Sequence, residues 1–456
     1  MRYIMYSKFA HLFQYAIYIT HILFFCVQMA FPSCLVHASD QDATASEKEV
    51  WLTIFVHGIM SIKHHLSVEN IMRFICDDVR NCLYEKTVAI MRSDPFFFRN
   101  QAMQEIGLRR IPDVGVTGIS NSAGLMAELF DCLYGNNGCS SKTETYYYTF
   151  GWSGLLSANA RYEDAVVFFN AISNEVSRFK DKKIIPKIRI IAYSHGGNVS
   201  LNLAAVRSAH HNIPDFKIDE LFLVGIPVQQ ETDYLINDPI FKAIYNLYSK
   251  SDRIQRLDPF SSKSFLSKRI FTQRPDLSLP SKLKQIEIQA TRCSMRLKRK
   301  ECNKKAVHIM DRYGIASGKS RLLRTVSPGH AELWFFGWTP FNYRKNFPLY
   351  PFPSIAIIPY ITRYFTSKDS LDCSINPCVF DVRPEFEQIV VKIDGQVDTI
   401  SFLKQVNFEY MKKKLISVAG RRASNSVYIM RINSAFERAQ EWQNAEDIMH
   451  YGLPDE

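Results

Sequence analysis

Unbroken apolar runs that stop abruptly at polar residues or glycine recur through the first half of the chain. A strand that is buried on both faces, as in a parallel sheet, gives a run of this kind. The runs predict five strands, at residues 50–56, 146–150, 188–193, 221–224 and 243–248. Between the second and third runs, apolar residues recur every three or four positions from 159 to 180, which predicts an amphipathic helix.

A second helix is expected at residues 198–207, directly after the third strand. Strands that alternate with helices predict an α/β domain whose mostly parallel sheet is flanked by helices. The long segment 60–140 follows the first strand as an insertion or lid, with helices expected at 68–84 and 123–133. Residues 341–456 form an accessory α+β extension of unassigned role, with strands expected at 388–394 and 427–432 and a helix at 402–418.

The first 38 residues have the pattern of an export signal. They contain Arg2 and Lys8 but no acidic residue, and a long apolar stretch runs from residue 9 to residue 30. The small-residue site Val-His-Ala predicts cleavage after Ala38. Because the stretch approaches the roughly 20 residues that span a bilayer, an uncleaved signal anchor is the alternative. Either form exports residues 39–456, so we expect a periplasmic, secreted or outer-surface protein.

The spacing of the cysteines agrees with export. Cys26 and Cys34 belong to the signal, and the other eight of the ten form close pairs: Cys76 with Cys82, Cys132 with Cys139, Cys293 with Cys302, and Cys373 with Cys378. Close pairs are typical of short-loop disulfides in an oxidising compartment. None of the pairs is a Cys-x-x-Cys with histidines at zinc-ligand spacing, so we expect no metal site.

Composition and charge narrow the class of protein. The 456 residues are 46% hydrophobic and 22% charged, which excludes a disordered, collagen-like or coiled-coil chain. The net charge is +11, and much of it lies around Cys293 and Cys302, at Arg292, Arg296, Lys298, Arg299, Lys300, Lys304 and Lys305. For an exported protein, an anionic membrane surface is a better partner for this segment than nucleic acid, but the sequence favours a merely solvated loop over either.

Polar residues stand where the predicted strands end, which is where ligands meet a parallel sheet. At the end of the third strand, residues 192–196 read Ala-Tyr-Ser-His-Gly. Small residues at both ends of this pentapeptide let a strand turn directly into a helix and lift the hydroxyl of Ser194 clear of the sheet. The alternative role for Ser194 is a helix cap.

A serine hydroxyl becomes a nucleophile when a base takes its proton and a carboxylate orients that base. Asp252 follows the fifth predicted strand at the same edge of the sheet, and His330 stands at a loop mouth with a helix expected behind it. Asp258 is the rival acid and lies further from the strand end. His308 is the rival base, in an apolar stretch behind the basic segment.

These motifs resemble those of α/β-hydrolases of the lipase and esterase kind, over residues 49–340. The matching segments are Phe-Val-His-Gly-Ile at 55–59, Tyr-Ser-His-Gly-Gly at 193–197, Ser-Asp at 251–252 and Gly-His at 329–330; Ala192 stands where that family usually has glycine. The resemblance implies a catalytic triad of Ser194, Asp252 and His330. It also implies that the backbone N–H groups of Ile59 and His195 form the oxyanion hole.

Two aromatic side chains complete the expected site. His57 and Trp152 are candidates for the substrate pocket, although the resemblance favours a loop-shaping role for His57 and packing is the alternative for Trp152. In the insertion, Phe96, Phe97 and Phe98 are either a lid patch that meets lipid or the core of a cap.

We therefore expect a secreted serine hydrolase that cleaves carboxylic esters of a lipid or another hydrophobic acyl compound, with no metal or organic cofactor. No Gly-x-x-x-x-Gly-Lys-Ser/Thr loop and no Gly-x-Gly-x-x-Gly follows a predicted strand, so nucleotide binding is not expected. The alternatives are a catalytically inactive hydrolase fold that binds a partner, and an acyltransferase or thioesterase that uses the same triad. The sequence leaves the oligomeric state open.

Overall fold

A computed structural model describes residues 49–60, 73, 76–100, 102–112, 122–134, 143–209, 216–256, 267–293, 323–334, 354–368, 371–383, 388–401 and 425–451. The chain divides into the units Met1–Glu47 and Lys48–Glu456, and every described residue belongs to the second. The predicted signal, the rival residues Asp258 and His308, most of the basic segment and the helix expected at 402–418 lie outside the described residues.

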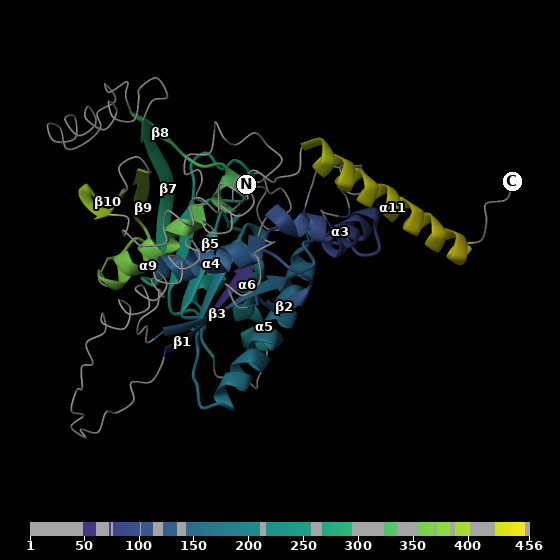
Figure 1. Ribbon diagram of the computed structural model, residues 1–456, viewed down its shortest axis with the longest axis horizontal. Coiled ribbons are helices and arrows are strands. Elements are labelled where there is room, and N and C mark those ends of the chain that lie inside the picture. The colour runs from purple at the N-terminus through teal and green to yellow at the C-terminus, as the bar shows by residue number, and fades with distance from the viewer. Residues whose placement is uncertain are drawn as a thin grey trace, which may run out of the picture. The chain divides into compact units, whose positions relative to one another are not determined.

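The described part of the chain contains one mixed, mostly parallel sheet (Figure 1). Its order is β11-β10-β9-β7-β6-β5-β4-β1-β3-β2, with β8 paired to β7. The pairs β2–β3, β7–β8, β9–β10 and β10–β11 are antiparallel, and the other neighbours are parallel. The strands are β1 (Glu49–Val56), β2 (Gly107–Arg110), β3 (Thr143–Gly151), β4 (Lys187–Tyr193), β5 (Glu220–Val224), β6 (Ile244–Tyr248), β7 (Leu283–Cys293), β8 (Leu323–Val326), β9 (Cys378–Arg383), β10 (Gln388–Ile393) and β11 (Gln396–Ser401).

Helices cover both faces of this sheet. On one face, Ile188 and Ile190 of β4 belong to an apolar core shared with α5 (Ala158–Lys180) and α6 (His195–Ala209). On the other face, Ile191 of the same strand joins a core with α4 (Ser122–Tyr134), α8 (His330–Trp334) and α9 (Ile358–Thr366). Successive residues of β4 therefore enter different cores, as alternation along a strand requires. The expected α/β class with a helix-flanked, mostly parallel sheet is confirmed.

Most of the elements expected from the apolar pattern are present. The five predicted strands correspond to β1, β3, β4, β5 and β6, and the strand expected at 388–394 corresponds to β10. The helices expected at 123–133, 159–180 and 198–207 correspond to α4, α5 and α6. The side chain of Ser157 caps α5 by accepting the Ala160 N–H at 3.0 Å.

Two predictions of secondary structure are wrong. Residues 427–432, expected as a strand, lie inside the helix α11 (Asn425–Tyr451). The helix expected at 68–84 does not continue through 76–82, because Asp77 and Asn81 have positive φ values of 54° and 55°, and α3 (Leu83–Ser93) begins only after this turn. Strands β7 and β9 have no counterpart among the expected elements.

The insertion and the C-terminal region share a third apolar core. Figure 1 shows α11 beside α3, and the described contacts agree. Ile432 and Ala435 of α11 share this core with Met60, which follows the loop after β1, and with Phe96 and Phe97 of the 3-10 helix Pro95–Asn100. Both phenylalanines are buried, and both rings contact Tyr428 of α11. Of the two roles considered for the phenylalanine cluster, the described packing favours the core of a cap.

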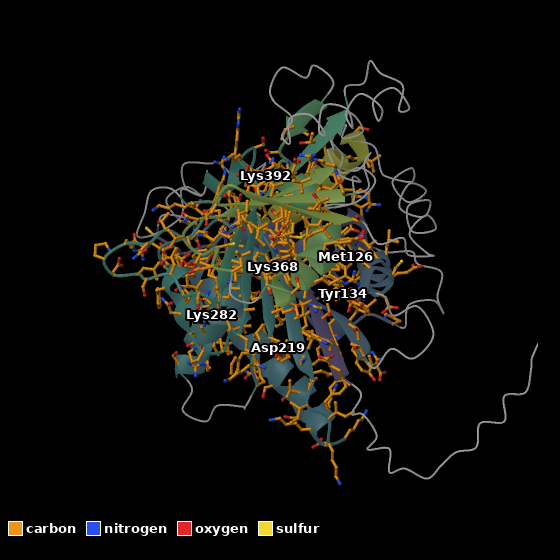
Figure 2. The ribbon with its side chains drawn as sticks, turned by 90° about the vertical axis from the view of Figure 1, so that its left-hand side faces the viewer. Met126, Tyr134, Asp219, Lys282, Lys368 and Lys392 are labelled. Carbon is orange, nitrogen blue, oxygen red and sulfur yellow. The ribbon has the colours of Figure 1, made fainter. Side chains whose placement is uncertain are left out.

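Strands β9, β10 and β11 form the edge of the sheet that is opposite to β2. Lys368, directly after α9, pairs with Asp398 of β11 at 2.5 Å, and Lys392 of β10 pairs with Asp381 of β9 at 3.5 Å. Figure 2 labels both lysines on the side that faces the viewer. None of the helices in the described ranges is long and apolar enough to cross a membrane.

No disulfide joins the described residues Cys76, Cys82, Cys132, Cys373 and Cys378. Cys373 and Cys378 are both fully buried and share a side-chain hydrogen bond. The predicted disulfide pairings stay predictions.

Candidate active site

Ser194 occupies the sharp turn between β4 and α6. Its φ of 51° lies in the left-handed region, a conformation that costs a non-glycine residue about 1–3 kcal/mol. The neighbouring strand helps to hold the turn, because the Ser194 N–H donates to the Val224 carbonyl at 2.9 Å. The side chain thus stands at the carboxyl edge of the sheet, where the pentapeptide predicted it.

The loop after β1 packs directly on this turn. A Cβ at Gly58 would lie 2.9 Å from Tyr193 Cδ1 and 3.0 Å from Ser194 Cβ, closer than a side chain can approach without displacing its neighbours. Glycine at position 58 therefore lets the segment that carries Ile59 run against the serine turn.

Asp252 and His330 converge on Ser194 from two other loops. Asp252 follows β6 and is fully buried, and its Oδ2 lies 2.7 Å from Nδ1 of His330. His330 is the first residue of α8, and its Nε2 lies 3.0 Å from the hydroxyl oxygen of Ser194. The structure therefore brings all three residues of the predicted triad within hydrogen-bond distance.

The acceptors in the hydrogen-bond chain from Asp252 through His330 to Ser194 determine which atoms carry the protons. A carboxylate only accepts, so Nδ1 of His330 carries the proton and donates it to Asp252, which leaves Nε2 to accept the Ser194 hydroxyl. Asp252 is itself fixed, because its Oδ1 accepts the Gln255 N–H at 3.1 Å and its backbone carbonyl accepts Nε of Arg269 at 2.7 Å. This arrangement holds the imidazole ready to take a proton from the serine.

Gly225, which directly follows β5, lies against the imidazole of His330. Its φ is +65°, and a Cβ there would lie 3.5 Å from both His330 Cε1 and Asp252 Oδ2 and 3.1 Å from Leu333 Cδ1. No motif in the sequence pointed to Gly225. The sign that the sequence does carry is a glycine at the end of β5, the strand between β4, which precedes Ser194, and β6, which precedes Asp252.

His57 and Trp152, the two pocket candidates, are fully buried and bonded to each other. Nε1 of Trp152 donates to the His57 carbonyl at 2.7 Å, and the Trp152 N–H donates to Nε2 of His57 at 3.2 Å. The rings are stacked at a centroid distance of 5.5 Å. The pair joins the loop after β1 to the loop after β3, while a role in the substrate pocket stays a prediction.

Burial fixes the charge state of His57. Burial and the nearby Arg92 cation lower the pKa of His57 well below its usual 6.5, so the ring is neutral. Nδ1 contacts the Gly58 carbonyl at 2.6 Å, which only accepts, so Nδ1 carries the ring proton and Nε2 is free to accept the Trp152 N–H. A neutral imidazole with both nitrogens engaged has no proton-transfer role in this position.

Ile59 and His195 are placed where the resemblance requires backbone donors. Ile59 follows Gly58 in the loop that packs on the serine turn, and His195 is the first residue of α6, directly after Ser194. The N-terminus of a helix favours negative charge. Two N–H groups from these positions suit an oxyanion, and that role stays a prediction.

The imidazole of His195 is buried beside the triad. Burial, together with the charges of Arg161 and His330, lowers the pKa of His195 well below 6.5. The amide nitrogen of Asn198 lies 3.4 Å from Nδ1 of His195, and the oxygen of the same amide accepts the Thr232 hydroxyl at 2.6 Å. His195 is therefore a neutral neighbour of the triad.

In the described ranges, no three His, Cys, Asp or Glu side chains are grouped in a way that could hold a metal ion. No protein-family model matches the chain, and no curated protein matches it.

Proposed function

We propose that this protein is a serine hydrolase of the α/β-hydrolase type that cleaves carboxylic esters through an acyl-enzyme on Ser194. The observation that carries the proposal is the continuous hydrogen-bond chain from Asp252 through His330 to Ser194, with distances of 2.7 Å and 3.0 Å. A catalytically inactive fold has no need of this convergence, so the geometry favours an enzyme over a binding module.

The first half of the reaction forms the acyl-enzyme. The hydroxyl oxygen of Ser194 attacks the ester carbonyl carbon while Nε2 of His330 takes the hydroxyl proton. The carbonyl oxygen becomes an oxyanion that the N–H groups of Ile59 and His195 stabilise. Collapse of the intermediate breaks the bond to the alcohol, which leaves with the proton from His330.

The second half releases the acid. Water gives a proton to Nε2 of His330 and attacks the acyl carbon, and the serine oxygen leaves with that proton as the acyl bond breaks. Asp252 keeps the imidazole in the required tautomer and stabilises the imidazolium in both halves. An acyltransferase or thioesterase would use the same triad with a different acceptor or leaving group.

The proposed substrate class is an ester of a lipid or another hydrophobic acyl compound. Its support is the resemblance of the motifs to those of lipases and esterases. Trp334, which stacks on Tyr193 at 5.2 Å, and Leu333 are fully buried core residues and add only apolar surroundings behind the triad. The buried phenylalanines of the insertion add no support, because they pack on α11.

A fluorophosphonate probe tests the proposal, because it labels a serine only when that serine is activated. We expect the folded protein to be labelled at Ser194, and Ser194→Ala to remove labelling. Ser208→Ala is the matched control, since it removes an exposed hydroxyl at the far end of the same helix. A folded wild-type protein that stays unlabelled would exclude the proposed mechanism.

Acyl esters of increasing chain length then test the substrate class. We expect the rate to rise with chain length, because the proposed substrate is a hydrophobic acyl ester. Activity restricted to two-carbon acyl groups would contradict a hydrophobic substrate. Transfer of the acyl group to an added alcohol in preference to water would identify an acyltransferase.

A further inference from the structure

Ser249 is a fully buried serine that the mechanism above does not use. It directly follows β6, three residues before Asp252. Its hydroxyl donates to the Pro328 carbonyl at 2.5 Å, and Pro328 lies two residues before His330. A single side chain therefore links the loop that carries the acid to the loop that carries the base.

The backbone of Ser249 also shapes the acid loop. Its carbonyl accepts the Asp252 N–H at 3.2 Å, and its hydroxyl oxygen accepts the Ser251 N–H at 3.3 Å. The hydroxyl is thus oriented by one loop while it donates to the other. This bond runs beside the Asp252–His330 bond and opposes any separation of the two loops.

The base loop depends on such tethers because it is short and leads into a helix of five residues. Other groups hold it from the sheet and from α8: the Tyr193 hydroxyl donates to the His330 carbonyl at 3.2 Å, and the Glu332 carboxylate accepts the Gly329 N–H at 2.7 Å. Neither of these bonds comes from the acid loop. Ser249 differs from Tyr193 and Glu332 because its hydrogen bond joins the base loop to the loop that carries Asp252.

We propose that Ser249 is a positioning residue that sets the distance between His330 and Asp252, an inference that rests on the proposed hydrolase function. Without the hydroxyl, the Pro328 carbonyl loses its donor and the base loop can move away from the acid loop. Displacements of the order of 1 Å in a catalytic group reduce rates by about a hundredfold. The carboxylate would then stabilise the imidazolium less well.

The pH dependence of acylation distinguishes positioning from a structural role. The ionisable groups around the His330 ring are Asp252, His195 on α6, Tyr193 on β4 and Glu332 on α8. Of these, Asp252 is the group on the loop that the Ser249 hydroxyl ties to the base loop. Weaker contact with a carboxylate favours the neutral imidazole, so the acid limb of the profile moves to lower pH. Loss of folded protein alone lowers the amplitude of labelling and leaves the midpoint in place.

The experiment measures the rate of fluorophosphonate labelling against pH for the full chain, wild type and Ser249→Ala. We expect the plateau rate to fall about tenfold or more and the midpoint of the acid limb to move to lower pH. Ser200→Ala is the matched control, because it removes a buried hydroxyl that bonds a carbonyl within its own helix. It should leave the rate and the midpoint unchanged.

The outcomes separate the two proposals. If the wild type is not labelled, the hydrolase proposal fails. If the wild type is labelled and Ser249→Ala reacts at the same rate with the same midpoint, the positioning role is wrong while the hydrolase stands. If Ser249→Ala does not fold, Ser249→Val removes the donor while filling the buried space and is measured in the same way, and a rate and midpoint equal to wild type again overturn the inference.

Discussion

Gly196 lies against the backbone of His57 so closely that a Cβ at position 196 would be 2.3 Å from the His57 carbonyl oxygen. The same carbonyl accepts the hydrogen bond from Nε1 of Trp152. The start of α6, the loop after β1 and the loop after β3 therefore meet at one oxygen atom. The segments that carry Ser194 and Ile59 cannot be displaced independently.

Gly196→Ala should consequently be among the most damaging small substitutions in the chain. The methyl group meets backbone, which cannot rotate away, so we expect a loss of about 3 kcal/mol or more in the free energy of unfolding, at the upper end for overpacking. Denaturant unfolding measures this loss, and probe labelling should disappear. Gly395→Ala is the control, because it has positive φ but open space and should cost about 1–2 kcal/mol. Equal losses would show that the contact with His57 is unimportant.

Trp152→Phe tests the bond between the two loops. The ring remains aromatic, but the buried carbonyl of His57 loses a donor, which costs about 1–3 kcal/mol. Labelling of Ser194 should also slow, because the loop that carries Ile59 is less well held. Trp334→Phe is matched, since Trp334 is buried and its Nε1 has no hydrogen-bond partner in the described structure. If both variants lose the same stability, the Trp152–His57 bond contributes nothing.

The two buried histidines predict how stability depends on pH. The pKa values of His57 and His195 are lowered well below 6.5 in the fold, so in the acid range only the unfolded chain binds these protons. Stability should therefore fall as the pH drops below about 6.5, with each histidine contributing up to about 1.4 kcal/mol per pH unit. Urea unfolding between about pH 7 and about pH 5 measures this slope. His195→Gln should reduce the slope by about one proton, and an unchanged slope would show that His195 titrates normally.

Cys373 and Cys378 form one of the predicted disulfide pairs that lie in the described residues, and we expect the bond to form after export. Their thiols already share a hydrogen bond, which lowers the pKa of Cys373, while burial raises the pKa of Cys378. Closing so short a loop should stabilise the fold by about 2 kcal/mol. Non-reducing peptide mapping should find the linked pair, and a reductant should lower the unfolding midpoint. The double variant Cys373→Ala/Cys378→Ala should be insensitive to reductant, and exported protein with both thiols free would contradict the pairing.

The sequence predicted most reliably the strands that are buried along their whole length, because such strands appear in it as unbroken apolar runs. Strands β1 and β4 lie in the middle of the sheet and give unbroken apolar runs, so their ends located His57 and Ser194. Asp252 and His330 were then placed by strand order and loop context, and the structure brings both to Ser194.

The elements that were not predicted are stabilised by residues that are distant in the sequence. Strand β7 carries Gln285 and Glu287 in buried positions, where the amide bonds the carbonyls of Phe271 and Ser374 and the carboxylate pairs with Lys250. These polar residues break the apolar run that marks a buried strand. The segment 427–432 is apolar apart from Arg431 and so resembles a strand, but it belongs to the helix α11, which packs on α3. The role of Ser249 depends on Pro328, 79 residues later.

The contact between α3 and α11 has a consequence for the order of folding. Lys86 pairs with Gln443 and Glu446, which follow it by 357 and 360 residues. The apolar core that includes Met60 and Phe97 therefore cannot close until α11 has been synthesised. A nascent chain must carry these side chains unprotected until then, and closing so long a loop is intrinsically slow. Completion of this core is thus a late event in folding.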